Sequence, residues 1–205
     1  MFNNQKLNGE GLDFFRELEN IGAGHAATAL SELLSRPVAV RVPRAQFCAY
    51  SEICRILKGP ENVVAGLLVG ISCDVSGFIL LVLDEADAKM LARAVLMDMA
   101  DQLPESEREE LCMSALKEVA NILIGSYITA ISEMTGLKID ASVPELVFDM
   151  AGAVMNLLAV AYGEFGDQVL FMETEFCDRE QSLLGHFFLI PEIASYKTLT
   201  EKFGI

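Results

Sequence analysis

The sequence contains a displaced copy of one of its own segments. When the chain is shifted by 101 positions, the window from Asp13 to Pro43 falls on the window from Ser114 to Pro144 without a gap. Ten of these 31 positions hold the same residue in both windows, whereas ordinary amino-acid frequencies would give about two matches. The matched pairs are Glu17/Glu118, Asn20/Asn121, Ile21/Ile122, Gly24/Gly125, Thr28/Thr129, Ala29/Ala130, Ser31/Ser132, Glu32/Glu133, Val42/Val143 and Pro43/Pro144. The period is too long for a solenoid, so it predicts one supersecondary unit used twice around a single core.

Each copy begins with a long helical segment and continues into a short β-branched run. Segments 12–35 and about 105–134 are expected to be helices, the second closed by Thr135-Gly136. The runs 38–42 and 139–143 are expected to be strands that end at the matched prolines. Four more strand candidates form two hairpins, which are 63–72 with 75–84 and 168–176 with 182–190.

The two copies differ after their prolines. Residues 145–163 are predicted to be helical, whereas the corresponding stretch 44–57 is shorter and irregular, and residues 84–99 form a helix that joins the halves. These patterns predict an α+β fold in which two pseudo-symmetric repeats share an antiparallel-rich sheet, with the two long motif-bearing helices and additional helices packed on it. The repeats would span about 12–99 and 105–204 of a single domain over residues 1–205.

Composition excludes several classes of function. A formal net charge of -15 argues against nucleic-acid binding, which needs a cationic surface. The five cysteines form no C-x-x-C pair, so we expect neither a disulfide framework nor a metal site, but free thiols in a reducing cytoplasm. The polar N-terminal stretch and the short apolar runs predict no export signal and no membrane-spanning segment.

The repeated helix carries a polar stripe beside its apolar face. At 100° per residue, Glu17, Asn20, Gly24, Thr28 and Ser31 lie on one side of the first helix. The second helix repeats the stripe with Ser114, Glu118, Asn121, Gly125, Thr129 and Ser132. Glycine, threonine and serine are weak helix formers, so the stripe is suited to the close approach of another backbone. The alternative is that Gly24 and Gly125 let the two long helices cross each other, leaving the Glu and Asn side chains without a role.

One spacing occurs twice, in register. It is D/S-x3-E-x2-N-x22-P, present as Asp13/Glu17/Asn20/Pro43 and as Ser114/Glu118/Asn121/Pro144. This pattern resembles the signature of the CheC group of chemotaxis phosphatases, relatives of CheX and of the phosphatase part of the flagellar protein FliY. His25 stands where Asn is usual in the group, and Ala120 where Gly is usual before the second Asn.

The resemblance implies an enzyme that hydrolyses the aspartyl phosphate of a phosphorylated CheY-like response regulator. Asn20 and Asn121 would each orient a water molecule, because a carboxamide both donates and accepts hydrogen bonds without adding charge. Glu17 and Glu118 would pair with the regulator's lysine. The motif positions Asp13, Pro43, Ser114, Pro144, Gly24 and Gly125 would support these four residues. The enzyme would need no cofactor of its own, since the regulator supplies Mg²⁺.

The same resemblance implies a second partner, the receptor deamidase CheD. It would bind the segment 145–163, with Asp149 as an acidic contact beside Leu146 and Met150. The helical spacing of the apolar residues there equally predicts packing on the sheet. Three other functions stay open: a non-catalytic binding partner of CheD or of phosphorylated CheY, a flagellar switch component, and a duplicated scaffold with Asn20 and Asn121 buried. Both histidines, His25 and His186, are expected to be packed side chains.

Overall fold

The structure is a computed structural model that describes residues 9–96, 104–162, 168–177 and 182–203. The first half begins with a long helix and ends with a shorter one, and three strands and a short helical stretch lie between them. Its elements are α1 (Gly9–Leu33), β1 (Ala39–Ala49), η1 (Tyr50–Glu52), α2 (Ile53–Ile56), β2 (Val63–Cys73), β3 (Gly77–Asp84) and α3 (Glu85–Leu96). The second half follows a similar order. Its elements are α4 (Glu105–Thr135), β4 (Ile139–Ala141), β5 (Glu145–Met150), α5 (Ala151–Tyr162), β6 (Gln168–Cys177), β7 (Ser182–Pro191) and α6 (Ile193–Phe203).

The strands form one antiparallel sheet to which both halves contribute. Its order is β1-β6-β7-β3-β2-β4, and β5 also pairs with β2. The hairpins β2–β3 and β6–β7 meet at the centre, where Leu80 of β3 lies opposite Phe188 of β7. The outer strand β1 pairs with β6 of the other half, and β4 and β5 pair with β2 of the other half. The predicted α+β class with a shared antiparallel sheet is therefore confirmed. The strand order is the one that a two-fold arrangement of repeats would produce, although the duplication itself stays a prediction.

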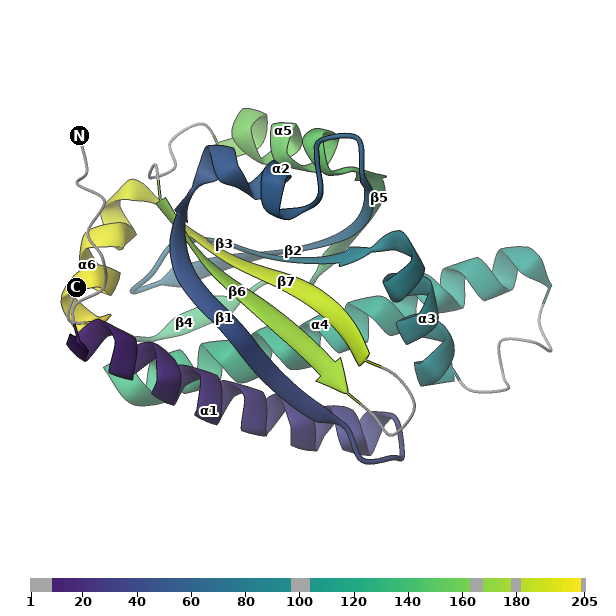
Figure 1. The fold of residues 1–205 in the computed structure, drawn as a ribbon, viewed down its shortest axis with the longest axis horizontal. Coiled ribbons are helices and arrows are strands. Elements are labelled where there is room, and N and C mark those ends of the chain that lie inside the picture. The colour runs from purple at the N-terminus through teal and green to yellow at the C-terminus, as the bar shows by residue number, and fades with distance from the viewer. Residues whose placement is uncertain (1–8, 97–103, 163–167, 178–181, 204–205) are drawn as a thin grey trace.

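Helices cover both faces of this sheet. Figure 1 shows α1 and α4 side by side below the sheet, with α2 and α5 above it. The lower core contains Leu18 and Leu30 of α1 with Leu123 and Tyr127 of α4, all buried. A separate apolar cluster, which includes Ile53 of α2, Val154 of α5 and the sheet residues Phe171 and Phe188, fills the upper side. Because the long helices bury one side against the sheet, their opposite sides face solvent.

The matched prolines mark a β-bulge and not the end of a strand in the first half. Strand β1 continues past Pro43 to Ala49, and between Arg41 and Arg44 its register with β6 shifts. In the second half β4 ends at Ala141, and β5 begins directly after Pro144 with the same one-residue shift against β2. Proline cannot donate a ladder hydrogen bond, which is why it is found at edge strands and bulges. The prediction that a strand stops at Pro43 is wrong.

The helix predicted over 145–163 is also wrong in its first part. Residues Glu145–Met150 form β5, and helix α5 begins only at Ala151. Leu146 packs against the lower core and Val147 against the upper cluster, so neighbouring residues point to opposite faces, as in a strand. The edge of β2 offers unpaired backbone groups that this segment satisfies by pairing. The stretch 44–57 is likewise more regular than expected, since it completes β1 and forms α2.

The expected helix boundaries agree with the structure to within a few residues. Helix α4 ends at Thr135, and Gly136 adopts the left-handed conformation (φ 73°) that closes a helix. By length and composition alone α4 could cross a membrane, contrary to the expectation that no segment could. However, 44% of its most apolar window is buried in this fold, and its apolar side chains belong to the lower core.

Candidate active site

The polar stripe of α1 faces solvent. Glu17, Asn20, Gly24 and Thr28 are exposed, and Ser31 is half-buried. Asp13 lies in α1 and Pro43 in β1, but both side chains fall outside the described residues. Buried Leu18, Ala26 and Leu30 occupy the other side of the helix and pack into the lower core.

The stripe of α4 has the same exposure. Ser114, Glu118, Asn121 and Thr129 are exposed, whereas Gly125 and Ser132 are half-buried. Within the described part of the chain, the side chains of Asn20, Asn121, Glu17 and Glu118 have no hydrogen-bond or ion-pair partner. Both carboxamides are thus open to a molecule outside the chain, and the scaffold interpretation, which required them to be buried, is wrong.

The stripe glycines do not form the contact between the helices. A Cβ atom added to Gly24 or to Gly125 would meet nothing within 4 Å. The close contact is made by Gly22, where an added Cβ would lie 2.5 Å from Cδ1 of the buried Tyr127 ring of α4. Gly22 therefore allows the helices to pack together. The interpretation of Gly24 and Gly125 as the crossing contact is wrong, and the two glycines leave the stripe open.

Hydroxyl groups further along the first stripe are occupied by local hydrogen bonds. The hydroxyl of Thr28 donates to the carbonyl of Gly24 (3.1 Å). The hydroxyl of Ser31 donates to the carbonyl of Ala27 (2.6 Å) and accepts from the backbone N–H of Val38 (2.9 Å). Ser31 thus fixes the turn that leads from α1 into β1. The groups left for an external partner are the carboxylate of Glu17 and the carboxamide of Asn20, which lie about two to four turns before Thr28 and Ser31.

The bulge at Pro144 is held firmly by the sheet. Pro144 is buried, and Ser142 exchanges two hydrogen bonds with Gly70 of β2: its N–H donates to the Gly70 carbonyl (2.9 Å) and its hydroxyl accepts from the Gly70 N–H (3.0 Å). Between them Val143 is 80% exposed. Pro144 therefore lies at the bulge where β5 replaces β4 as the partner of β2.

The two histidines differ in exposure. His25 is exposed, so the expectation that it is a packed side chain is wrong. His186 is buried in β7, as expected. Desolvation lowers the pKa of His186, although the neighbouring carboxylates of Glu173 and Asp84 act in the opposite direction. Sequence periodicity could not place His25, because it sits at the border between the polar and apolar sides of α1.

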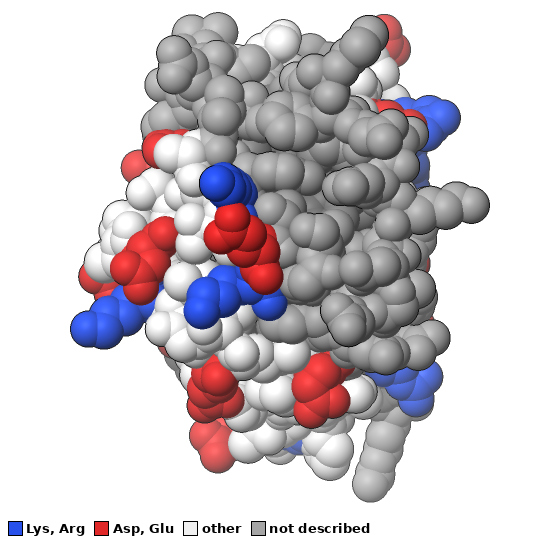
Figure 2. All heavy atoms as spheres, turned by 90° about the vertical axis from the view of Figure 1, so that its left-hand side faces the viewer, with Lys and Arg blue, Asp and Glu red and all other residues white. Residues whose placement is uncertain are grey.

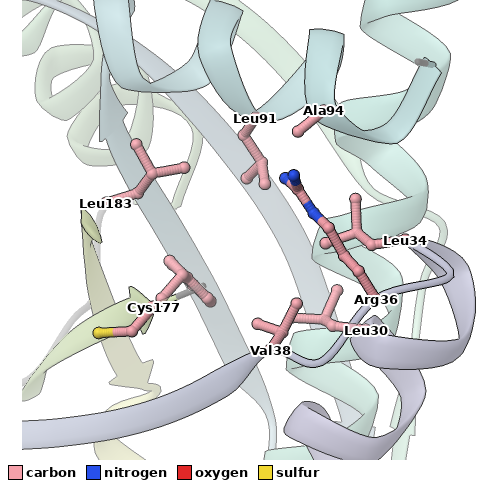
Figure 3. Close-up of a pocket in the computed structure, with 9 residues that line it drawn as sticks. Leu30, Leu34, Arg36, Val38, Leu91, Ala94, Cys177 and Leu183 are labelled. Atoms are coloured by element: carbon pink, nitrogen blue, oxygen red, sulfur yellow. The ribbon is translucent and has the colours of Figure 1, made fainter. Parts of the chain in front are cut away.

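A small pocket lies away from both stripes and is mainly apolar. It is lined by Leu30 and Leu34 of α1, Leu91 of α3 and Leu183 of β7, and the Arg36 side chain extends toward Leu91 (Figure 3). Its lining contains no carboxylate or amide side chain. Among the residues that the structure describes, no cluster of His, Cys, Asp or Glu has the arrangement to hold a metal ion.

The three residues suggested to contact CheD lie on β5. Leu146 is half-buried against the lower core, so its packing role is the one observed. The Asp149 carboxylate is half-buried and accepts a hydrogen bond from the backbone N–H of Met150 (2.7 Å). The Met150 side chain is 47% exposed, opposite the exposed Val63 of β2. The helical spacing behind the packing alternative does not apply in a strand, although Leu146 does pack on the core.

Surface charge is mixed on one side of the molecule. Figure 2 shows basic side chains scattered among acidic ones on the side of the molecule that bears α6, and no continuous basic area on the described part of this view.

Comparison with solved structures identifies the fold. Among solved structures, the chain is similar to FliY from Thermotoga maritima, with a TM-score of 0.74, 22% identity and coverage of 98% of both chains. It also resembles a CheX–CheY–BeF3–Mg complex structure from Borrelia burgdorferi, with a TM-score of 0.54, 18% identity and coverage of 88% of this chain and 97% of that one. These likenesses establish the fold.

Sequence similarity establishes the family. The model of the CheC-like family matches residues 111–148. The CheY-P phosphatase CheC from Bacillus subtilis is 30% identical over 197 residues, which cover 95% of this chain and 94% of that protein. The flagellar motor switch phosphatase FliY from the same organism is 32% identical over 134 residues, 65% of this chain but only 34% of FliY. The chain belongs to the CheC-like family.

Proposed function

We propose that this protein is a phosphatase that hydrolyses the aspartyl phosphate of a CheY-like response regulator. Its relatives include a CheY-P phosphatase and a flagellar motor switch phosphatase. The observation that carries the proposal is the presence of two solvent-exposed Glu/Asn pairs, each beside a glycine whose surroundings are open. A protein that acts on another folded protein needs such a protruding, accessible site. A cytoplasmic location follows from this choice of substrate.

The substrate supplies the groups that stabilise charge. A phosphorylated receiver brings its acyl phosphate, its lysine and a bound Mg²⁺, and metal ions and cationic groups offset the charge of a transferring phosphoryl group. A fold neighbour of this chain was solved with CheY, BeF3 and Mg, and tetrahedral BeF3 stands in for the phosphoryl group. No cofactor of the phosphatase itself is required by this proposal.

The carboxamide of Asn20 or Asn121 supplies an oriented water molecule. The carboxamide can accept a hydrogen bond from this water through its oxygen or donate one to it through its N–H group. Either contact holds the water in line with the phosphorus atom. The water oxygen forms a bond to phosphorus as the bond from phosphorus to the aspartyl oxygen breaks. Both hydrogens of the water leave with the released phosphate as H₂PO₄⁻, and the regulator regains its free carboxylate.

The glutamates act in docking. Glu17 precedes Asn20 by three residues, as Glu118 precedes Asn121, so each pair lies on one side of its helix. A carboxylate placed as a base beside a phosphoryl group would be repelled by its negative charge. An ion pair with the regulator's lysine instead fixes the docked helix and directs the neighbouring carboxamide at the phosphorus.

The double variant Asn20→Ala/Asn121→Ala tests the mechanism. We expect phosphate release from an acyl-phosphorylated CheY-like regulator to slow by roughly 100-fold, the cost typical of a misplaced reacting group, while binding to the BeF3-loaded regulator persists. Thr28→Ala/Thr129→Ala is the matched control, because both threonines are exposed on the same stripes. Equal rates for the asparagine variant and the parent would rule out this assignment.

We further propose that CheD binds at β5, which would make the chain a regulator of that deamidase as well. Exposed Met150 and Val63 lie opposite each other beside Asp149, and together they offer an apolar contact with an acidic neighbour. In a co-elution experiment Asp149→Lys should release CheD, whereas Glu145→Lys, an exposed position at the start of the same strand, should not. Retention of CheD by Asp149→Lys contradicts this contact.

A further inference from the structure

The two candidate sites lie on one side of the molecule, on neighbouring helices that run in opposite directions. Figure 1 shows α1 and α4 side by side beneath the sheet and antiparallel to each other. Gly22 and Tyr127 are in direct contact, so these two residues are level along the helix pair. Since both helices bury their opposite sides in the same core, the stripes with Asn20 and Asn121 both face away from the sheet.

The spacing of the two sites follows from this contact. Asn20 precedes Gly22 by two residues, and Asn121 precedes Tyr127 by six. In an antiparallel pair these offsets add, so at about 1.5 Å per residue the asparagines lie about 12 Å apart along the helices. Packed helix axes are about 8–10 Å apart. The two sites are therefore separated by only about 15 Å between the axes, with side chains adding a few ångströms.

A receiver domain is much wider than this separation. A domain of about 100 residues has a radius of gyration of about 13 Å, which corresponds to a compact body more than about 30 Å across. Resting on the proposed function, we propose that the two sites are mutually exclusive, so that one chain binds a single phosphorylated regulator at a time, at either the Asn20 site or the Asn121 site. A second regulator would have to occupy the volume already filled by the first.

Stoichiometry and site-specific variants test this inference together. The probe is a purified CheY-like regulator loaded with BeF3 and Mg²⁺, titrated into the full-length chain by calorimetry, with sedimentation velocity as an independent measure of complex size. Glu17→Lys disables the first site and Glu118→Lys the second, because each places a cation against the regulator's lysine. Glu32→Lys and Glu133→Lys are matched controls, since this repeated pair is also exposed but lies outside both Glu/Asn pairs.

The parent is expected to bind one regulator per chain. Each single-site variant should still bind one, with the Kd raised about twofold, because two equivalent exclusive sites contribute a statistical factor of two to affinity. The double variant should not bind, and the two controls should match the parent. A parent complex with two regulators overturns the inference alone. Loss of all binding in one single-site variant also overturns it, because the other site would then be inactive. No binding by the parent overturns the proposed function and this inference with it.

Discussion

His186 gives the folded protein a specific dependence on pH. The residue is 7% exposed, and its Nδ1 atom has no hydrogen-bond partner among the described residues. Burial lowers its pKa in the folded state, with smaller opposing effects from Glu173 and Asp84 and a further lowering by Lys58. Below the unfolded value of about 6.5, the unfolded chain binds the proton more readily than the folded chain. The contribution of neutral His186 to the free energy of unfolding should therefore be complete above that pH and be lost as the pH falls below it.

The prediction is that His186→Phe flattens this dependence. Urea unfolding of the parent at pH 7.5, 6.5 and 5.5 should show a falling free energy of unfolding, by about 1.4 kcal/mol for each unit of pKa shift traversed. His25→Phe is the control, because His25 is exposed. If the free energy of unfolding falls with pH as steeply in both the His186 and the His25 variant as in the parent, the buried imidazole does not cause the pH dependence.

The Glu and Asn positions could be singled out from sequence because they hold identical residues at a fixed displacement, and all four side chains are exposed in the structure. Gly22 could not be found in this way. Its counterpart 101 positions later is Leu123, and both positions contribute to the core. Gly22 packs against Tyr127, whose counterpart 101 positions earlier is Ala26, so neither partner of this contact is matched by an identical residue. The alternative interpretation placed the crossing at Gly24 and Gly125 because these are the glycines that match between the two windows.

At the scale of the helix, Gly22 and Gly24 should respond in opposite ways to the same substitution. Gly22→Ala puts a methyl group against the buried Tyr127 ring, so we expect destabilisation by about 1–3 kcal/mol, as in other overpacked cores. Gly24→Ala and Gly125→Ala meet open space and should stabilise α1 and α4 by up to about 1 kcal/mol each. Urea unfolding at pH 7.5 measures all three changes.

The same variants separate stability from function. Although Gly24→Ala/Gly125→Ala should be more stable than the parent, it should bind the BeF3-loaded regulator more weakly, because its methyl groups protrude where the regulator's backbone approaches. Unchanged affinity in this more stable variant would show that the stripe glycines have no part in docking.

The error over residues 145–150 arose from an ambiguity in periodicity. Apolar residues at 146, 147, 150 and 154 fit a helix, but alternate packing of Leu146 and Val147 on opposite faces equally fits a strand. The neighbouring strand β2 decides that residues 145–150 form a strand, because its edge must be paired or covered. A single segment carries no information about that edge. The long helices α1 and α4 were predictable because twenty or more residues of consistent pattern leave little ambiguity.

At the scale of the whole molecule, the halves are interleaved and not placed side by side. Strand β1 pairs with β6, and β4 and β5 pair with β2, so each outer strand of one half is hydrogen-bonded to the other half. Helices α1 and α4 also share one core. Neither half can therefore complete its part of the sheet or cover its apolar side alone. The local pattern predicted a shared sheet, but this exchange of strands depends on long-range pairing that the pattern does not record.

Interleaving predicts that the chain unfolds in a single cooperative transition. The sequence has no tryptophan, so one can be introduced as a reporter in each half: Phe78→Trp in β3 and Phe148→Trp, a 37% exposed position in β5. In each variant, the urea midpoint measured by tryptophan fluorescence should coincide with the midpoint measured by far-UV circular dichroism. The calorimetric and van't Hoff enthalpies of unfolding should also agree. Two separate domains would instead give two midpoints. Unfolding of β1 would remove the partner of β6 in the second half, and unfolding of β5 would remove a partner of β2 in the first half. Different unfolding midpoints for the two reporters would therefore contradict the strand order.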